Sequence, residues 1–183
     1  MEIERTAIDG VLIIRPKKFE DERGFFAPIW KTTVLREAGI DHDWVQENES
    51  RSLRKGTVRG MHFQRAPYAQ AKLVRVSRGS AVDVCVDIRI GSPTRGRHVS
   101  TILSEDNLIL VYVPVGFAHG LCTLTDDTVV NYKVSAEWSP VHEGGVLWSD
   151  PLLGIRWPIS SREAIISDRD RLWLPFSELS AET

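Results

Sequence analysis

The sequence has few cysteines, no long apolar run and almost no excess of charge of either sign. Cys85 and Cys122 are the only cysteines among 183 residues; they form no CxxC pair and are too few for a disulfide-stapled secreted module. We expect both to be small buried hydrophobes. No stretch approaches the roughly 18 apolar residues of a membrane span, and the first residues lack the apolar run of a signal peptide. The sequence therefore predicts a cytoplasmic protein with no membrane partner.

The balance of charges argues against an extended polyanion as a partner. The 23 lysines and arginines and the 25 aspartates and glutamates give a formal net charge of -2, so we expect no nucleic-acid partner. Clustered arginines still suit a small phosphorylated ligand. Because 183 residues with 42% hydrophobic side chains can form one sizeable core, we expect a single domain over residues 1–183.

Helical periodicity is also scarce, and short runs with a period of two dominate. Val82, Val84 and Val86 alternate with polar residues, which predicts a half-buried strand that ends at the turn residues 91–93. Further strands are predicted at residues 74–76, 108–113 and 128–134, and short helices at residues 32–38 and 168–172. Many short strands between Gly/Pro turns indicate a mainly β sandwich or barrel. From about residue 145 to 183, tryptophans among prolines predict an irregular strap packed on this barrel.

The segment from residue 56 to 72 gathers side chains suited to acid–base chemistry. It places Arg59 and His62 between glycines, and Lys72 has the phase of the apolar strand that follows. A lysine on an apolar strand face either extends to the surface or points into a functional cavity, and phase alone leaves both open. Tyr132 also has the phase of an apolar face, which is compatible with a core tyrosine or with a site residue.

Two segments, residues 56–62 and 114–119, resemble the half-motifs of the cupin superfamily, whose members share a jelly-roll barrel. Many cupins bind a metal through two histidines and a glutamate of the first motif and one histidine of the second. Here no second histidine follows His62, and Lys72 stands near the place of the acidic ligand. Because an ammonium group has no lone pair and repels a divalent cation, we expect no metal ligands and no cofactor.

A series of short motifs runs in order from about residue 10 to 171. They are Asp21-x-Arg23-Gly24-x-Phe26, Gln46-x-Asn48-x-Ser50, Arg59-Gly60-Met61-His62-x-Gln64, Gln70-x-Lys72-Leu73, Asp87-x-Arg89 with Ser92-Pro93-Thr94, Pro114-x-Gly116-Phe117-x-His119-Gly120, Trp148-x-Asp150-Pro151 and Ile155-x-Trp157-Pro158. Together they resemble the dTDP-4-dehydrorhamnose 3,5-epimerase family of cupin-type enzymes. The resemblance implies a cofactor-independent isomerase of rhamnose or deoxysugar biosynthesis. Such an enzyme inverts C3 and C5 of a dTDP-4-keto-6-deoxyhexose through an enolate.

The resemblance also implies roles for four catalytic residues. His62 corresponds to the base that removes a proton next to the C4 ketone, and Asp170 to the aspartate that orients this base. Lys72 supplies positive charge for the enolate oxygen, and Tyr132 corresponds to the acid on the opposite face of the ring. Asp168 competes with Asp170 from the same short segment, and both also suit a turn or helix cap.

For substrate binding, the resemblance implies a diphosphate contact for Arg59 and polar pocket positions for Gln46 and Asn48. Trp138 corresponds to an aromatic residue that flanks the base of the nucleotide. His119 either contacts the sugar or its ketone, or has a structural role.

Arg23 and Phe26 correspond to residues that the family donates across a dimer interface, which implies a homodimer with composite sites. Pro28 stands where the family usually carries a glutamate near the nucleoside, which puts the exact sugar nucleotide in question. An epimerase of another deoxysugar pathway that inverts only C3 is therefore the main alternative. A non-catalytic nucleotide-sugar-binding cupin and a metal-dependent cupin oxygenase are the alternatives from other classes.

Overall fold

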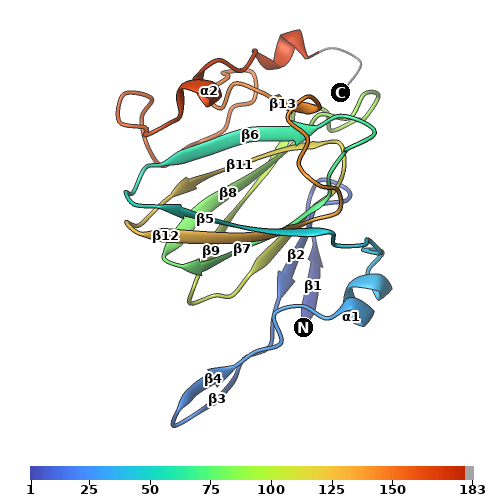
Figure 1. Ribbon diagram of the computed structural model, residues 1–183, viewed down its shortest axis with the longest axis vertical. Coiled ribbons are helices and arrows are strands. Elements are labelled where there is room, and N and C mark those ends of the chain that lie inside the picture. Colours follow the sequence, from blue (N-terminus) through green and yellow to red (C-terminus); the bar gives the residue numbers. More distant parts are fainter. Residues whose placement is uncertain (180–183) are drawn as a thin grey trace.

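The protein folds as two antiparallel β-sheets that face each other, as seen in a computed structural model that describes residues 1–179 (Figure 1). In spatial order, the first sheet contains β1 (Glu2–Arg5), β2 (Leu12–Arg15), β10 (Leu110–Val113), β7 (Lys72–Arg78), β12 (Thr128–Val134) and β5 (Gln46–Ser52). The second contains β13 (Glu143–Gly145), β6 (Val58–Gln64), β11 (Phe117–Thr123), β8 (Ser80–Asp87) and β9 (His98–Ser104). The prediction of a mainly β sandwich is confirmed.

Helix is confined, within residues 1–179, to α1 (Thr32–Glu37), α2 (Asp168–Arg171) and the 3-10 turn η1 (Phe176–Glu178). Both α-helices lie where the sequence predicted them. Across that part of the chain, no helix has the length and apolar character needed to cross a membrane. The strand predicted from residue 108 starts at Leu110, because Leu108 adopts a left-handed backbone conformation with φ 54°.

Apolar side chains pack in three layers around these sheets. The inner layer lies between the sheets and includes Val76, Phe117 and Val130. A second layer covers the outer face of the five-stranded sheet, where the segment after β13 contributes Trp148. In the third layer, Leu35 of α1 packs on the outer face of the six-stranded sheet. The sandwich is therefore buried on its inner faces and over large parts of both outer faces.

Strand β8 departs from its predicted half-buried state. Val84 and Val86 pack outward beneath the C-terminal segment, and Cys85 points into the inner layer. The polar Asp83 and Asp87 are also buried, at 2% and 0% exposure. The prediction of a half-buried strand was wrong, because the C-terminal segment covers the apolar face and the polar face points into the molecule.

A two-stranded hairpin extends away from the sandwich (Figure 1). It consists of β3 (Phe19–Asp21) and β4 (Gly24–Phe26), which pair antiparallel with each other only. Phe19, Phe25 and Phe26 are exposed on it at 52%, 54% and 70%. Apolar side chains gathered on a projecting hairpin are unusual on a protein surface that stays exposed to water.

Candidate active site

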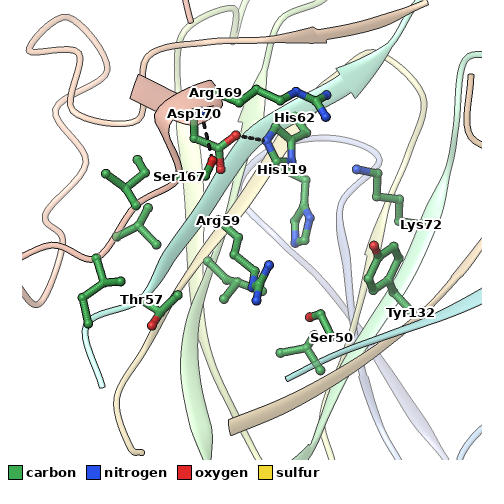
Figure 2. A pocket seen from close by; sticks show the side chains of 15 residues that line it. Ser50, Thr57, Arg59, His62, Lys72, His119, Tyr132, Ser167, Arg169 and Asp170 are labelled. Carbon is green, nitrogen blue, oxygen red and sulfur yellow. Dashed lines mark hydrogen bonds and ion pairs between the residues drawn. The ribbon is translucent and has the colours of Figure 1, made fainter. Parts of the chain in front are cut away.

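Two cavities meet inside the open end of the sandwich. The larger, of about 510 Å³, reaches from His62 and Lys72 to the start of β6, and the smaller, of about 360 Å³, opens toward Trp138. Both cavities are lined by His62, Lys72 and Tyr132. Figure 2 shows the larger cavity with His62 on one side and Lys72 beside Tyr132 on the other. A substrate with two parts therefore has room to place one part in each cavity.

His62 is held by a buried carboxylate. Its Nε2 lies 2.7 Å from Oδ1 of Asp170, which is 5% exposed. The other carboxylate oxygen, Oδ2, accepts the backbone N–H of Gly60, and Oδ1 also accepts the indole N–H of Trp173. Burial acts to raise the pKa of Asp170, but the hydrogen bonds from His62, Gly60 and Trp173 hold this pKa below its usual range. The pair is suited to a neutral imidazole that gains a proton beside a carboxylate.

Local backbone chemistry places both members of this pair. Ser167 caps α2 by accepting the backbone N–H of Asp170, which presents the Asp170 side chain to β6. Asp168 is exposed on the same helix, so the structure brings Asp170 to His62 and leaves Asp168 outside. Gly60 has φ 123°, and a Cβ there would lie 2.5 Å from the Cα of Gly120. Only glycine allows β6 and β11 to approach so closely beside His62.

Lys72 and Tyr132 come from paired strands of the opposite sheet. Lys72 shares the inward face of β7 with Val74 and Val76 and is 9% exposed, so the structure selects the cavity over the surface. Burial lowers the pKa of Lys72 from 10.5 to about 8, while the neighbouring Cys85 and Asp83 oppose the shift. A lysine in this state is an ammonium ion at neutral pH that loses its proton in mild alkali.

Tyr132 stays protonated over the same range. Burial raises the pKa of Tyr132, although the charge of Arg59 acts against this shift. Its phenol is therefore a proton donor at neutral pH.

A second histidine lines the larger cavity beside the first, on the neighbouring strand of the same sheet. His119 on β11 pairs in register with His62 on β6, and its Nε2 lies 2.7 Å from Oδ2 of Asp83. Both members of this pair are buried, at 8% and 2% exposure. The structure is thus compatible with both roles that the sequence left open for His119, contact with the sugar and support of the site.

The residues predicted to bind the nucleotide lie around the smaller cavity and its border. Gln46, Asn48 and Trp138 line the smaller cavity, where Gln46 hydrogen-bonds both Asn48 and the backbone of Trp138. Arg59 lines the larger cavity, and its guanidinium group donates to Ser52 and to the Arg51 backbone carbonyl. These contacts pre-orient the side chains for a charged ligand at the cavity mouth.

Arg23 and Phe26 lie apart from these cavities within one chain. Both belong to the projecting hairpin, where Arg23 bonds to Asp21 and Phe26 is largely exposed. Pro28 follows the hairpin and is partly buried. One chain alone therefore assembles the catalytic candidates but not these two binding candidates.

Sequence reasoning missed three residues of this region, Asp83, Glu143 and Trp173. Asp83 was taken for a solvent-facing residue because its phase opposed the valines of β8. Glu143 accepts the indole N–H of Trp138 and forms an ion pair with Arg169. Trp173 lies just beyond α2, three residues after Asp170, and donates its indole N–H to Asp170; this closeness in the chain was the available signal.

The histidines of the cavity are already engaged by carboxylates. Over residues 1–179, no group of three or more His, Cys, Asp and Glu side chains is placed to hold a metal ion. Beside the two histidines stands Lys72, which brings a cation where a metal site needs a donor with a lone pair. This chemistry suits proton transfer between side chains better than coordination of a metal.

Comparison with known proteins gives this arrangement a family. Residues 5–178 match the family model described as dTDP-4-dehydrorhamnose 3,5-epimerase. The dTDP-4-dehydrorhamnose 3,5-epimerase of Sinorhizobium fredii is 47% identical over 170 residues, covering 93% of this chain and 87% of that protein. This chain belongs to the dTDP-4-dehydrorhamnose 3,5-epimerase family. The resemblance predicted from the motifs is confirmed.

Solved structures of dTDP-4-dehydrorhamnose 3,5-epimerase family members share the fold. A Bacillus anthracis epimerase, described with TDP and PPi bound, superposes with a TM-score of 0.91 at 44% identity, covering 94% of this chain and 97% of that one. A Legionella pneumophila epimerase, described in complex with dTDP-4-keto-L-rhamnose, gives a TM-score of 0.93 at 40% identity and covers 99% and 95%. The predicted cupin-type architecture is thereby confirmed.

Proposed function

We propose that this chain inverts C3 and C5 of a dTDP-4-keto-6-deoxyhexose by proton transfer next to the C4 ketone, without a metal or cofactor. The observation that carries the proposal is the His62–Asp170 pair facing Lys72 and Tyr132 across one cavity (Figure 2). An α-epimerisation requires a base on one face of the bound ring, an acid on the other face, and a cation near the oxygen that becomes the enolate.

In the first step, His62 removes the proton from a carbon beside the ketone. Because Nε2 donates to Asp170, the lone pair on Nδ1 is the one left to accept this proton. The C–H bonding electrons form a double bond to C4, and the π electrons of the carbonyl move onto the C4 oxygen, which gives the enolate. Asp170 stabilises the imidazolium that forms, and the Lys72 ammonium stabilises the enolate oxygen.

In the second step, the Tyr132 phenol donates its proton to the opposite face of the same carbon. The enolate collapses to the ketone, and the configuration at that carbon is inverted. His62 then loses its extra proton and Tyr132 regains one from solvent, so the enzyme returns to its starting state. The same sequence at the other α carbon completes the double inversion.

Replacing Tyr132 with phenylalanine is expected to separate proton removal from inversion. Net epimerisation should fall on the order of 10²- to 10⁴-fold, because the general acid is lost. Exchange of substrate α protons with solvent should persist, because His62 can return a deuteron to the face from which it took the proton. The measurement is NMR in D₂O of both deuterium uptake and product formation. Equal loss of exchange and inversion would show that Tyr132 does more than donate a proton.

We also propose that the active form is a homodimer in which the hairpin completes the site of the partner. The support is its projection from the sandwich and the exposure of its phenylalanines. Burial of three phenylalanine side chains contributes several kcal/mol at about 25 cal/mol per Å². Arg23 and Phe26 would then reach the nucleotide site of the second copy.

Complementation between inactive protomers tests the composite site. Co-expressing His62→Ala with an Arg23→Ala/Phe26→Ala protomer should restore activity, because each mixed dimer contains one site with neither defect. With random pairing, about a quarter of all sites should be active. Co-expressing His62→Ala with Asp170→Asn is the matched control, since both defects lie in the same-chain part of the site and no mixed dimer has an intact one. Restoration in both pairs, or in neither, would contradict the composite site.

The 3-only epimerase differs from this proposal in one outcome. The relatives reported above are named 3,5-epimerases or carry a 4-keto-rhamnose ligand, which favours inversion at both carbons. Incubation with a dTDP-4-keto-6-deoxyglucose followed by NMR of the product distinguishes the two. Inversion at C3 alone would establish the 3-only alternative, and no turnover at all would refute the epimerase proposal. A cytoplasmic location remains a prediction; the free buried thiols of Cys85 and Cys122 are compatible with it.

A further inference from the structure

The segment of residues 135–142, between β12 and β13, brings Trp138 to the smaller cavity without belonging to either sheet. A backbone outside a strand ladder needs other partners for its N–H and C=O groups where it is shielded from water. In this segment the partners are largely side chains. Three glutamines from separate parts of the chain bond the backbone of four consecutive residues, 136 to 139.

Gln64 on β6 makes the largest share of these bonds. Its Nε2 donates to the carbonyl oxygens of Glu137 at 3.1 Å and Tyr68 at 2.7 Å, and its Oε1 accepts the backbone N–H of Ser139 at 2.6 Å. The side chain is buried, with Gln64 8% exposed, and both of its N–H groups and its oxygen are used. A carboxylate in this place would set an oxygen against two carbonyl oxygens, so the contacts require an amide.

Gln70 and Gln46 hold the same segment from two other directions. Nε2 of Gln70 donates to the carbonyl of Ala136 at 2.6 Å, and Oε1 of Gln46 accepts the backbone N–H of Trp138 at 3.2 Å. The indole N–H of Trp138 donates to Glu143 at 2.9 Å. Trp138 is therefore fixed through its backbone and through its ring, although it is 53% exposed.

Proton transfer as described above gives Gln64 and Gln70 no task, yet each stands beside a catalytic side chain. Gln64 lies two residues after His62 on β6, and Gln70 lies two residues before Lys72 at the entry to β7. Alternation along an extended chain turns each glutamine to the side of its catalytic neighbour, and both line the smaller cavity with Trp138. The chain segments that place the base and the cation thus also place the indole.

We propose that Gln64 and Gln70 are positioning residues for Trp138: they fix residues 136–139 so that the indole is in place to stack on the base of the nucleotide while the sugar lies at His62. This inference rests on the proposed function, in which the smaller cavity takes the nucleotide. An aromatic ring that is already fixed loses little freedom when the ligand binds. The two amides therefore act on nucleotide affinity, and proton transfer does not involve them.

Replacing Gln64 with methionine, which has a similar length, removes all three of its bonds. The affinity for dTDP, measured by calorimetry, is expected to fall about tenfold, because the ring is no longer held where the base stacks. KM should rise by a similar factor. At saturating substrate, kcat should stay close to that of the unaltered protein, since His62, Lys72 and Tyr132 are unchanged. Gln70→Met removes only the bond to Ala136 and should give a smaller rise in KM.

A double-mutant cycle separates positioning from a general loss of stability. Trp138→Ala should weaken dTDP binding by itself, and adding Gln64→Met to it should cause little further loss, because the glutamine acts through the indole. Ile14→Ala is the matched control. Ile14 is fully buried in the apolar layer outside the six-stranded sheet, so its loss lowers stability without touching the cavity, and dTDP affinity should be unchanged.

Hydrogen exchange of the ligand-free protein gives a reading that needs neither binding nor turnover. Mass spectrometry of the peptide that contains residues 136–139 should show slow exchange in the unaltered protein and faster exchange in Gln64→Met and Gln70→Met. Gln70→Met carries this test if Gln64→Met does not fold.

Three results would overturn the inference. They are an unchanged dTDP affinity in both glutamine variants, an equal loss from Gln64→Met with and without the indole, and unchanged exchange of residues 136–139. An unchanged dTDP affinity in Trp138→Ala would remove the nucleotide from the smaller cavity and overturn the inference with it. A protein that binds dTDP in this glutamine-dependent way but inverts no sugar would refute the epimerase function alone.

Discussion

His62→Ala is expected to abolish the exchange of substrate α protons with solvent. The loss should be at least on the order of 10³-fold, because the imidazole placed to take the proton is gone and the neighbouring His119 is bonded to Asp83 instead. Folding and nucleotide affinity should change little, since His62 lies at the cavity surface with 29% of its side chain exposed. The measurement is deuterium uptake at C3 and C5 by NMR, with nucleotide affinity measured by calorimetry.

Two variants of α2 provide the control for this expectation. Asp170→Asn should slow exchange strongly, because the imidazolium loses its stabilising carboxylate. Asp168→Asn changes the same charge two residues away on the exposed side of the helix, and should leave exchange near the level of the unaltered protein. Exchange that survives in His62→Ala would mean that another group removes the proton.

Lys72→Met is expected to abolish turnover while making the protein more stable. Methionine has similar length but cannot stabilise the enolate. At pH 7 the folded protein holds Lys72 as a buried ammonium ion, with its pKa lowered to about 8 from 10.5. Folding below this pH therefore carries a desolvation cost that methionine removes. Urea unfolding at pH 7 should show Lys72→Met to be more stable by about 1–3 kcal/mol.

The pH dependence of this gain in stability follows from the same lowered pKa of Lys72. Between pH 8 and pH 10.5 the unfolded chain keeps the Lys72 proton that the folded chain has lost, so this lysine makes the unaltered protein more stable as pH rises. The advantage of Lys72→Met should shrink over that window. Lys133→Met is the control, because Lys133 is paired with Glu47 on the same sheet and should show no such window. A Lys72→Met protein that is less stable at pH 7 would contradict the buried-charge account.

The strands and the short helices were predictable because they depend on local patterns. Period-two runs marked β7, β8, β10 and β12, and a short helix was predicted at residues 168–172, where α2 lies. The inward direction of Lys72 was one of two open alternatives, since phase identifies a shared face but not what lies on it. Whether Lys72 points into a cavity or to the surface depends on the residues of the facing sheet, which lie far from it in the chain.

The burial of Asp83 was beyond what local pattern shows. A period-two strand places alternate residues on opposite faces, and a polar face is ordinarily assigned to water. In β8 the C-terminal segment covers the valine face, so the polar residues face the interior instead. That covering segment is more than sixty residues away in the chain, and no signal within β8 reports it. The proposed contribution of Arg23 and Phe26 is also beyond a local pattern, because it would involve a second copy of the chain.

The most direct test of the account is proton exchange by protein freed of metal. The unaltered protein, treated with a strong chelator, is incubated in D₂O with a dTDP-4-keto-6-deoxyglucose, and deuterium is located by NMR. Deuterium is expected at both C3 and C5, at a rate that the chelator does not change, with inversion at both carbons. Absence of label, or label that returns only when a divalent metal is added back, would contradict proton transfer by His62 and Tyr132.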